Sequence, residues 1–240
     1  EGRRLTDCCD IAALHGCPTV FHSLAVLRHL PAILTNGADW YAGLGVGGHP
    51  GTQIITLTGP VRKPGCHEIP TGAPLRQVVE TFGGGVPEGD MLKAVQVGGP
   101  TGGWIAADSL DIALDRLSLA DVGVSLGPGI VKVATQRDCA LDLARQALVY
   151  AGEQSCGHCL FCREGTRQMA IILTDIAKGK AAPEDLDMLG ELAEGIKLNS
   201  VCRLGRTAPD AYLSTLRYFP DEYSAHLKAR HCPAGVCGIG

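Results

Sequence analysis

Apolar residues recur at a helical spacing of three and four positions along the C-terminal part of the chain. Three such faces begin at Ala140, Met169 and Leu186. Apolar side chains at this spacing share one side of a helix, so the region is predicted to be a helical bundle. The first helix is predicted over about 139–152, the second leaves from 163, and the third returns toward 199. Short connections between them predict an up-down-up arrangement.

The part of the chain before this bundle has shorter runs of strand character. Alternating or β-branched residues occur at 53–58, 67–69, 92–97 and 129–134, and one helical pattern occurs at 74–82. A few strands around one helix predict a compact module of the α+β class. Residues 1–52 contain one apolar helical patch and a glycine-rich stretch, so they are predicted to be a fragment that packs against something else.

The spacing of four cysteines is the strongest chemical signal in the chain. Cys156, Cys159 and Cys162 lie in the run S-C-G-H-C-L-F-C-R, and Cys202 lies just past the third predicted helix. A [4Fe-4S] cluster takes one cysteine thiolate per iron, and an antiparallel bundle would bring the remote cysteine back to the other three. Zinc also accepts four thiolates, but its ligands usually come as two C-x2-C pairs. The pattern therefore favours the cluster, with zinc and unliganded thiols as the alternatives.

A second group of candidate ligands lies toward the C-terminus. His226, Cys232 and Cys237 offer one imidazole and two thiolates on a short segment, three of the four ligands of a structural zinc site. Cys139 is the candidate fourth ligand, because it starts the helix that ends at the cysteine loop, and the last helix, after Pro220, should begin at the same far end of the bundle and place His226 near it. At about 1.5 Å per residue this helix keeps Cys139 roughly 20 Å from Cys156, too far to join the cluster. The tail group is predicted to bind zinc, with a second iron-sulfur site and free thiols as alternatives.

Composition narrows the classes of function. The chain is 45% hydrophobic and 19% charged with a net charge of −4, which gives no electrostatic case for binding nucleic acid or an anionic membrane. It has no apolar run long enough to span a membrane and no signal-peptide core, so a cytoplasmic location is predicted. Eleven cysteines without a secretory signal indicate metal ligation in a reducing compartment. The cysteines outside the two groups are predicted to be structural or adventitious rather than metal ligands; they are Cys8, Cys9, Cys17 and Cys66.

Two glycine-rich runs are candidates for nucleotide binding. The run G-G-P-T-G-G at 98–103 follows a predicted strand, but Pro100 interrupts it and no helix start follows, so a tight turn is favoured over a phosphate cradle. The run at 43–48 lacks a preceding strand. The chain therefore shows no complete flavin or nicotinamide site. It also shows no nucleophile, base and orienting group in a recognisable pattern, so no catalytic residue is predicted.

Several stretches resemble a known family. They are E-Q-S-C-G-H-C-L-F-C-R-E-G-T at 153–166, S-V-C-R-L-G-R-T-A-P at 200–209, V-R-K-P-G-C-H-E-I-P-T-G at 61–72 and K-A-V-Q-V-G-G-P-T-G-G at 93–103. They resemble the NADH-oxidising flavoprotein (51 kDa-type) subunit of complex I. The tail at 221–237 is similar to relatives in NAD(P)-linked hydrogenases, formate dehydrogenases and electron-bifurcating complexes. The resemblance covers about residues 18–237.

This resemblance implies a domain order within the α+β class. Residues 1–52 would be a remnant of the flavin- and NADH-binding domain, and 53–136 a soluble-ligand-binding β-grasp module. Residues 137–230 would be a helical-bundle [4Fe-4S] domain, followed by a cysteine-containing tail at 231–240. In the family, electrons pass from NADH to FMN and then to this cluster. The family's FMN and NADH loop lies upstream of this sequence, and Phe21, His22 and Ser23 replace polar residues expected near FMN, so FMN or NAD binding is not predicted here.

The predicted function is electron transfer through one [4Fe-4S] cluster. The chain would be a subunit of a complex-I-like oxidoreductase, with other iron-sulfur and flavoprotein subunits as partners. One alternative is a complete NADH dehydrogenase subunit whose flavin lobe lies outside this chain. The other alternative is a non-redox scaffold subunit that metal ions stabilise.

Overall fold

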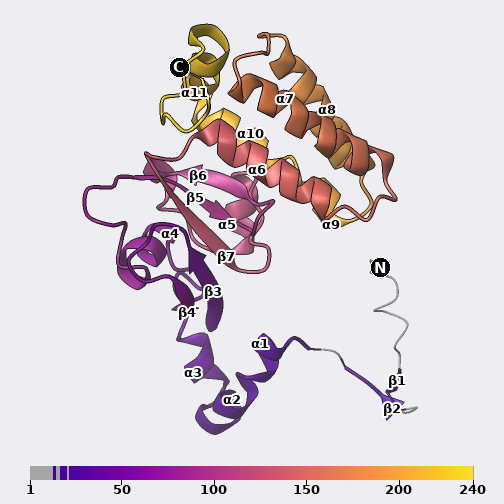
Figure 1. Cartoon of the computed structure of the whole chain (residues 1–240). Coiled ribbons are helices and arrows are strands. Elements are labelled where there is room, and N and C mark those ends of the chain that lie inside the picture. The colour runs from indigo at the N-terminus through magenta and orange to yellow at the C-terminus, as the bar shows by residue number, and fades with distance from the viewer. Residues whose placement is uncertain (1–12, 15–16, 21, 240) are drawn as a thin grey trace.

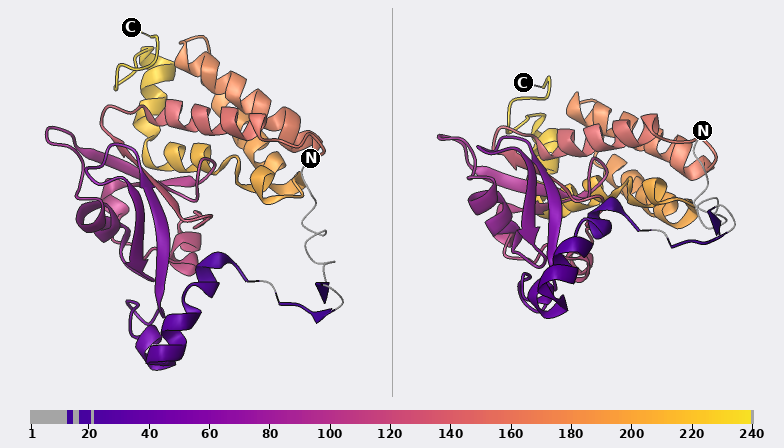
Figure 2. Two further views of the ribbon diagram at one scale, coloured as in Figure 1. Left: turned by 60° about the horizontal axis from the view of Figure 1, so that its bottom comes forward. Right: turned by 90° about the horizontal axis from the view of Figure 1, so that it is seen from below.

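The computed structural model describes residues 13–14, 17–20 and 22–239 of the chain. A mixed sheet lies in the middle, a helical bundle packs along one side of it, and the N-terminal helices project from its other end (Figure 1). Two further views show the same arrangement (Figure 2). Cys8, Cys9 and Phe21 lie outside the described residues. Within the described part, no helix is both long enough and apolar enough to cross a membrane.

The N-terminal arm makes few contacts with the rest of the chain. Its elements are β1 (Ala13–Leu14), β2 (Cys17–Pro18), α1 (Leu24–Leu27), α2 (Leu30–Asn36) and α3 (Ala38–Ala42). None of the residues of α2 and α3 is buried, and the side chains of Leu24 and Leu34 are exposed. Exposed leucines on short helices are typical of a surface that another domain covers. Assignment of residues 1–52 to a flavin-domain remnant stays a prediction.

The sheet contains five strands in the order β4-β3-β7-β5-β6. The strands are β3 (Thr52–Thr58), β4 (Gly65–Pro70), β5 (Leu92–Val97), β6 (Gly103–Ala106) and β7 (Ile130–Thr135). β3 and β7 run parallel, with Thr56 opposite Ile130, and the other pairs are antiparallel. Four of the five strands match predicted runs. β6 was not predicted, and neither was the short helix α5 (Arg116–Asp121).

The alternation of side chains along the strands gives the sheet two apolar faces. On β5, Val95 and Val97 belong to the core that includes Val78 and Val79 of the helical turns α4 (Leu75–Gln77) and η2 (Val78–Phe82). Ala94 faces the other way and packs with buried Trp104 against the bundle. A short 3-10 turn, η3 (Ala107–Ser109), follows β6. The predicted α+β fold is confirmed.

The bundle begins directly after the sheet. Its elements are α6 (Ala140–Glu153), η4 (Phe161–Gly165), α7 (Thr166–Ala177), α8 (Asp185–Asn199), α9 (Arg203–Thr207), α10 (Asp210–Tyr218), α11 (Pro220–Ser224) and η5 (Ala225–Ala229). The buried faces of α6, α7 and α8 form one core, which contains Leu148, Leu173 and Ile196. The predicted helical periodicity is therefore confirmed for all three long helices.

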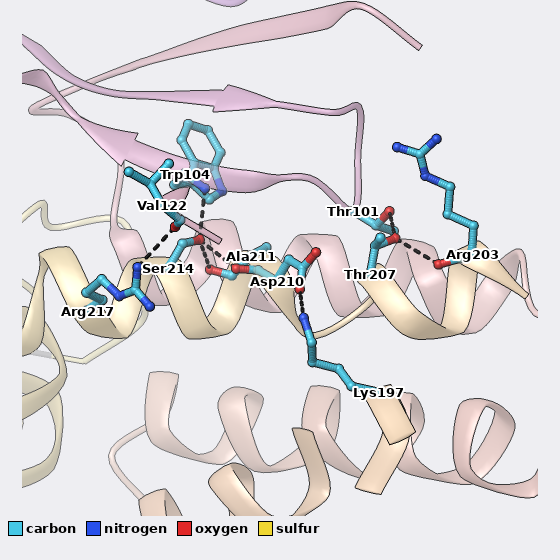
Figure 3. Close-up of polar contacts among 10 residues, drawn as sticks. All are labelled: Thr101, Trp104, Val122, Lys197, Arg203, Thr207, Asp210, Ala211, Ser214 and Arg217. Carbon is cyan, nitrogen blue, oxygen red and sulfur yellow. Dashed lines mark hydrogen bonds and ion pairs between the residues drawn. The ribbon is translucent and has the colours of Figure 1, made fainter. Parts of the chain in front are cut away.

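Polar contacts join the sheet to the helices that follow Cys202 (Figure 3). The backbone N–H of Trp104 donates to Ser214 Oγ at 2.8 Å, and Thr101 Oγ1 lies 3.1 Å from Thr207 Oγ1. Arg217 Nη1 donates to the carbonyl of Val122 at 3.0 Å. These bonds fix α9 and α10 against the edge of the sheet.

The glycine run at 98–103 forms the turn that carries this contact. It connects β5 to β6, and no helix begins in it, so the expected turn is confirmed. A Cβ on Gly102 would lie 2.0 Å from the carbonyl oxygen of Val97. A Cβ on Gly98, whose φ is +105°, would lie 2.3 Å from the carbonyl oxygen of Ser125. Close backbone packing, rather than phosphate binding, accounts for these glycines.

Replacement of Gly102 by Ala should destabilise the chain by about 1–3 kcal/mol, because the added methyl overlaps a backbone carbonyl. Gly190 of α8 is the matched control, because it is exposed and a Cβ there meets no atom within 4 Å. Gly190→Ala should be neutral or stabilising by up to about 1 kcal/mol, since Ala is the better helix former. Urea unfolding midpoints measure both variants. Equal midpoints would contradict the packing role of the turn.

Candidate metal centres

The loop between α6 and α7 carries three of the four predicted cluster cysteines. Cys156 is exposed, Cys159 is half-buried and Cys162, within η4, is buried. α8 and α9 both pack against η4, and Cys202 directly precedes α9. Burial raises the pKa of the Cys162 thiol, the hydrogen bond with Ser155 lowers it, and charge on Cys202, Cys159 and Cys156 adds to the rise. Cys202 thus starts a helix that packs against the turn carrying Cys162, and the assignment of all four cysteines to one centre stays a proposal.

Backbone conformation and hydrogen bonds account for several of the residues that lie between and beside the cysteines of the loop. Gly157 has a φ of +81°, a conformation that other residues rarely adopt. Its N–H donates to Ser155 Oγ at 3.3 Å, and Ser155 Oγ lies 3.6 Å from Cys162 Sγ. Arg163 Nη1 donates to the carbonyl of Gly157 at 2.6 Å, and Thr166 Oγ1 donates to the carbonyl of Cys162 at 2.6 Å. These hydrogen bonds within the protein help to define the conformation of the loop.

The segment around Cys202 is held equally closely. Ser200 is 2% exposed, and a Cβ on Gly205 would lie 2.5 Å from Ser200 Oγ and 3.3 Å from Cys162 Cβ. Within the described part of the chain, Ser200 Oγ has no hydrogen-bond partner. Buried hydroxyls are normally bonded, so an unpaired one near the buried thiol of Cys162 fits a bound group at this place. The donor set of four thiols fits a [4Fe-4S] cluster.

The cations near the loop have structural partners. Arg206 Nε donates to the carbonyl of Ser200 at 2.9 Å, and Arg203 Nη2 donates to Ser125 Oγ at 2.6 Å. The second contact joins the residue after Cys202 to the loop that precedes β7. Both arginines thus help to hold the fourth cysteine in place.

The tail brings a second group of ligand atoms together. The ligand atoms of Cys139, His226, Cys232 and Cys237 all lie within 4.8 Å of one another, and Cys139 Sγ is 3.5 Å from His226 Nε2. At a Zn–S distance of about 2.3 Å, tetrahedral ligands lie about 3.8 Å apart, so this spacing suits one ion. Among the described residues, it is the one group gathered this tightly. His231 is exposed and takes no part.

Neighbouring groups orient the ligands of the tail. His226 Nδ1 lies 2.7 Å from the carbonyl of Glu222 and must donate to it, which leaves Nε2 free to face Cys139. Burial raises the pKa of Cys139 to about 11. Burial also opposes ionisation of Cys232, but backbone N–H donors, led by that of Cys237, lower its pKa to about 6. Burial and the neighbouring Cys139 raise the pKa of Cys237.

Serines near the cysteines were not predicted to be part of the site. Ser155 and Ser200 each lie within two residues of a predicted ligand, which is the sequence signal that could have identified them. Of the remaining described cysteines, Cys17 and Cys66 are exposed and belong to neither group.

Comparison with known proteins identifies the class of both domains. Residues 142–226 match the NADH-ubiquinone oxidoreductase-F iron-sulfur binding region, and residues 54–103 match the SLBB domain. The chain therefore contains an iron-sulfur binding region of the type found in that oxidoreductase. The predicted [4Fe-4S] cofactor is confirmed at the level of the domain, while the assignment of individual ligands stays a proposal.

Individual relatives share both domains. The chain is 41% identical over 220 residues to the NADP-reducing hydrogenase subunit HndC of Solidesulfovibrio fructosivorans, covering 92% of this chain and 45% of that protein. It is 35% identical over 223 residues to the F subunit of NADH-quinone oxidoreductase from Streptomyces coelicolor, covering 93% of this chain and 49% of the relative. An NAD+-reducing [NiFe]-hydrogenase in the H2-reduced state matches with a TM-score of 0.76 and 30% identity over 89% of this chain and 36% of that one.

The chain is thus a relative of the 51 kDa-type F subunit of NADH-quinone oxidoreductase and of the hydrogenase protein HndC. The resemblance seen in the sequence motifs is confirmed. The chain spans about half the length of the curated relatives it matches.

Proposed function

We propose that the chain is an electron-transfer subunit of a complex-I-like oxidoreductase and relays electrons through one [4Fe-4S] cluster. The observation that carries the proposal is that Cys156, Cys159 and Cys162 lie on the loop leading through η4, and that Cys202 starts the helix packed against η4. When bound, the cluster supplies one-electron redox chemistry. The chain supplies the thiolates, shields the centre at buried Cys162, and leaves it near the surface at exposed Cys156.

The surface around the loop supports a partner subunit. The exposed apolar side chains next to the predicted ligands are Leu160, Phe161, Leu198 and Val201. Apolar side chains gathered at a redox site favour docking of a domain that exchanges electrons with it. The relatives named as hydrogenase and NADH-quinone oxidoreductase subunits support an iron-sulfur or flavoprotein subunit as this partner. We place the assembly in the cytoplasm, because free thiol ligands require a reducing compartment.

A complete NADH dehydrogenase subunit is the second candidate. It is favoured by the exposed leucines of the N-terminal arm, which a flavin-binding lobe could cover. Flavin released on denaturation, together with an intact mass well above that of these residues, would support it. A protein without iron at the loop would instead favour a metal-stabilised scaffold.

Replacement of Cys202 by Ser should remove most of the cluster iron and the reduced-state EPR signal, because it deletes one of four iron ligands. Cys66→Ser is the matched control, since Cys66 is exposed on β4 and lies outside both groups. Iron and sulfide analysis after anaerobic reconstitution measures both variants. If Cys202→Ser keeps full iron and the same signal, the assignment of the fourth ligand is wrong.

We also propose that Cys139, His226, Cys232 and Cys237 bind one structural zinc ion. The support is the spacing of their ligand atoms and the hydrogen bond that orients His226. Such a site would tie the tail to the start of α6, because Cys139 is the residue that caps this helix. Metal bound only by the folded chain adds its binding free energy to stability.

Cys237→Ser should lower the zinc content well below one ion per chain and leave the cluster iron unchanged, because the tail group shares no ligand with the loop. The unfolding midpoint should fall as well, since zinc binding no longer supports the fold. Elemental analysis with Cys66→Ser as control measures the effect. Iron with acid-labile sulfide at the tail, or a variant with undiminished zinc, would overturn the zinc assignment.

A further inference from the structure

The hydroxyl of Ser155 lies between the loop backbone and the buried ligand Cys162. Ser155 Oγ accepts the N–H of Gly157 at 3.3 Å and lies 3.6 Å from Cys162 Sγ. Because one lone pair of the oxygen is used by the amide, the hydroxyl proton is free to point at the sulfur. A thiolate sulfur has no proton of its own to give, so in a ligated Cys162 this contact must be a hydrogen bond donated by Ser155.

Ser200 offers a second hydroxyl at the same corner of the site. It is buried, and its Oγ has no partner among the described residues. A Cβ on Gly205 would lie 2.5 Å from Ser200 Oγ and 3.3 Å from Cys162 Cβ, so the Ser200 hydroxyl lies near that ligand. The guanidinium of Arg206 holds the carbonyl of Ser200, so the segment is fixed while its hydroxyl remains unused.

We propose that Ser155 and Ser200 are positioning residues that raise the reduction potential of the cluster by directing hydroxyl protons at the sulfur atoms around Cys162. The inference rests on the proposed function, since it requires a cluster at this loop. Reduction adds one electron and increases the negative charge on the sulfur atoms. A donated hydrogen bond therefore stabilises the reduced form more than the oxidised form. No bond in the protein is made or broken in this step.

The location of the two hydroxyls fits this role. They act on Cys162, the most buried of the four predicted ligands, where water cannot supply an equivalent hydrogen bond. At exposed Cys156, water can donate such a hydrogen bond, so a serine hydroxyl there would change the reduction potential little. The chain thus places its donors where they have the largest effect on potential.

The test is a potentiometric EPR titration of the full chain after anaerobic reconstitution with iron and sulfide. Ser155→Ala should lower the equilibrium constant for cluster reduction about tenfold, which corresponds to a midpoint about 59 mV more negative for a one-electron couple. Ser155→Thr keeps a hydroxyl and should stay near the wild-type midpoint. Ser200→Ala should shift the midpoint in the same direction as Ser155→Ala.

Thr174→Val is the matched control. The Thr174 hydroxyl donates to the carbonyl oxygen of Ala170 within α7 and takes no part in the loop. The isosteric change should leave the midpoint close to that of the wild type. A shift as large as that of Ser155→Ala would show that loss of a hydroxyl elsewhere has the same effect and would overturn the assignment.

The outcomes separate this inference from the proposed function. A wild-type chain that assembles no reducible cluster contradicts the proposed function itself. A Ser155→Ala chain with full cluster iron and an unchanged midpoint contradicts the inference alone. If Ser155→Ala assembles no cluster, the inference is tested by ENDOR spectroscopy of the reduced wild-type and Ser155→Thr chains. Spectra in H2O and D2O show whether exchangeable protons are coupled to the cluster. Exchangeable hydroxyl protons coupled to the cluster support the inference, and their absence overturns it.

Discussion

The close approach of two helices at the cysteine loop is the constraint on which the rest of the structure depends. A Cβ on Gly165, at the end of η4, would lie 2.6 Å from Ile196 Cγ1 of α8, and one on Gly195 of α8 would lie 3.3 Å from the ring of Phe161. Because these two glycines carry no side chain, Ile196 and Phe161 pack directly against the backbone of the facing element, and α8 ends beside the loop. Cys202 lies three residues beyond α8, at the start of α9, which packs against η4.

The two domains act together on this centre. Thr101 and Trp104, at the edge of the sheet, contact the helices that follow Cys202 (Figure 3). Arg203 also donates to Ser125, so the segment that begins at Cys202 is held from the sheet side as well as from the bundle. At the other end of α6, Cys139 joins the tail group. One helix of fourteen residues thus separates the two candidate metal centres. The four ligand atoms of the tail lie close enough together to share a single ion, whereas the four thiols proposed at the loop match the ligand count of a cluster.

Much of this organisation could be predicted because it depends on local patterns. Helical periodicity located the three long helices, and helix length alone kept Cys139 away from the loop and near the tail. β6 was missed because it is short and begins with glycine directly after the turn, and α5 is too short to show a helical period. The roles of Ser155 and Ser200 could not be predicted, since they depend on where tertiary packing places a hydroxyl relative to sulfur.

The central claim is that four thiolates from the loop and from the end of α8 hold one cubane. Mössbauer spectroscopy of the anaerobically purified wild-type chain, enriched in 57Fe and combined with sulfide analysis, tests it most directly. The account predicts four irons and four sulfides per chain at the loop, with the spectrum of a [4Fe-4S]2+ cluster. A chain that holds zinc as its sole metal, with neither iron nor sulfide, would contradict it.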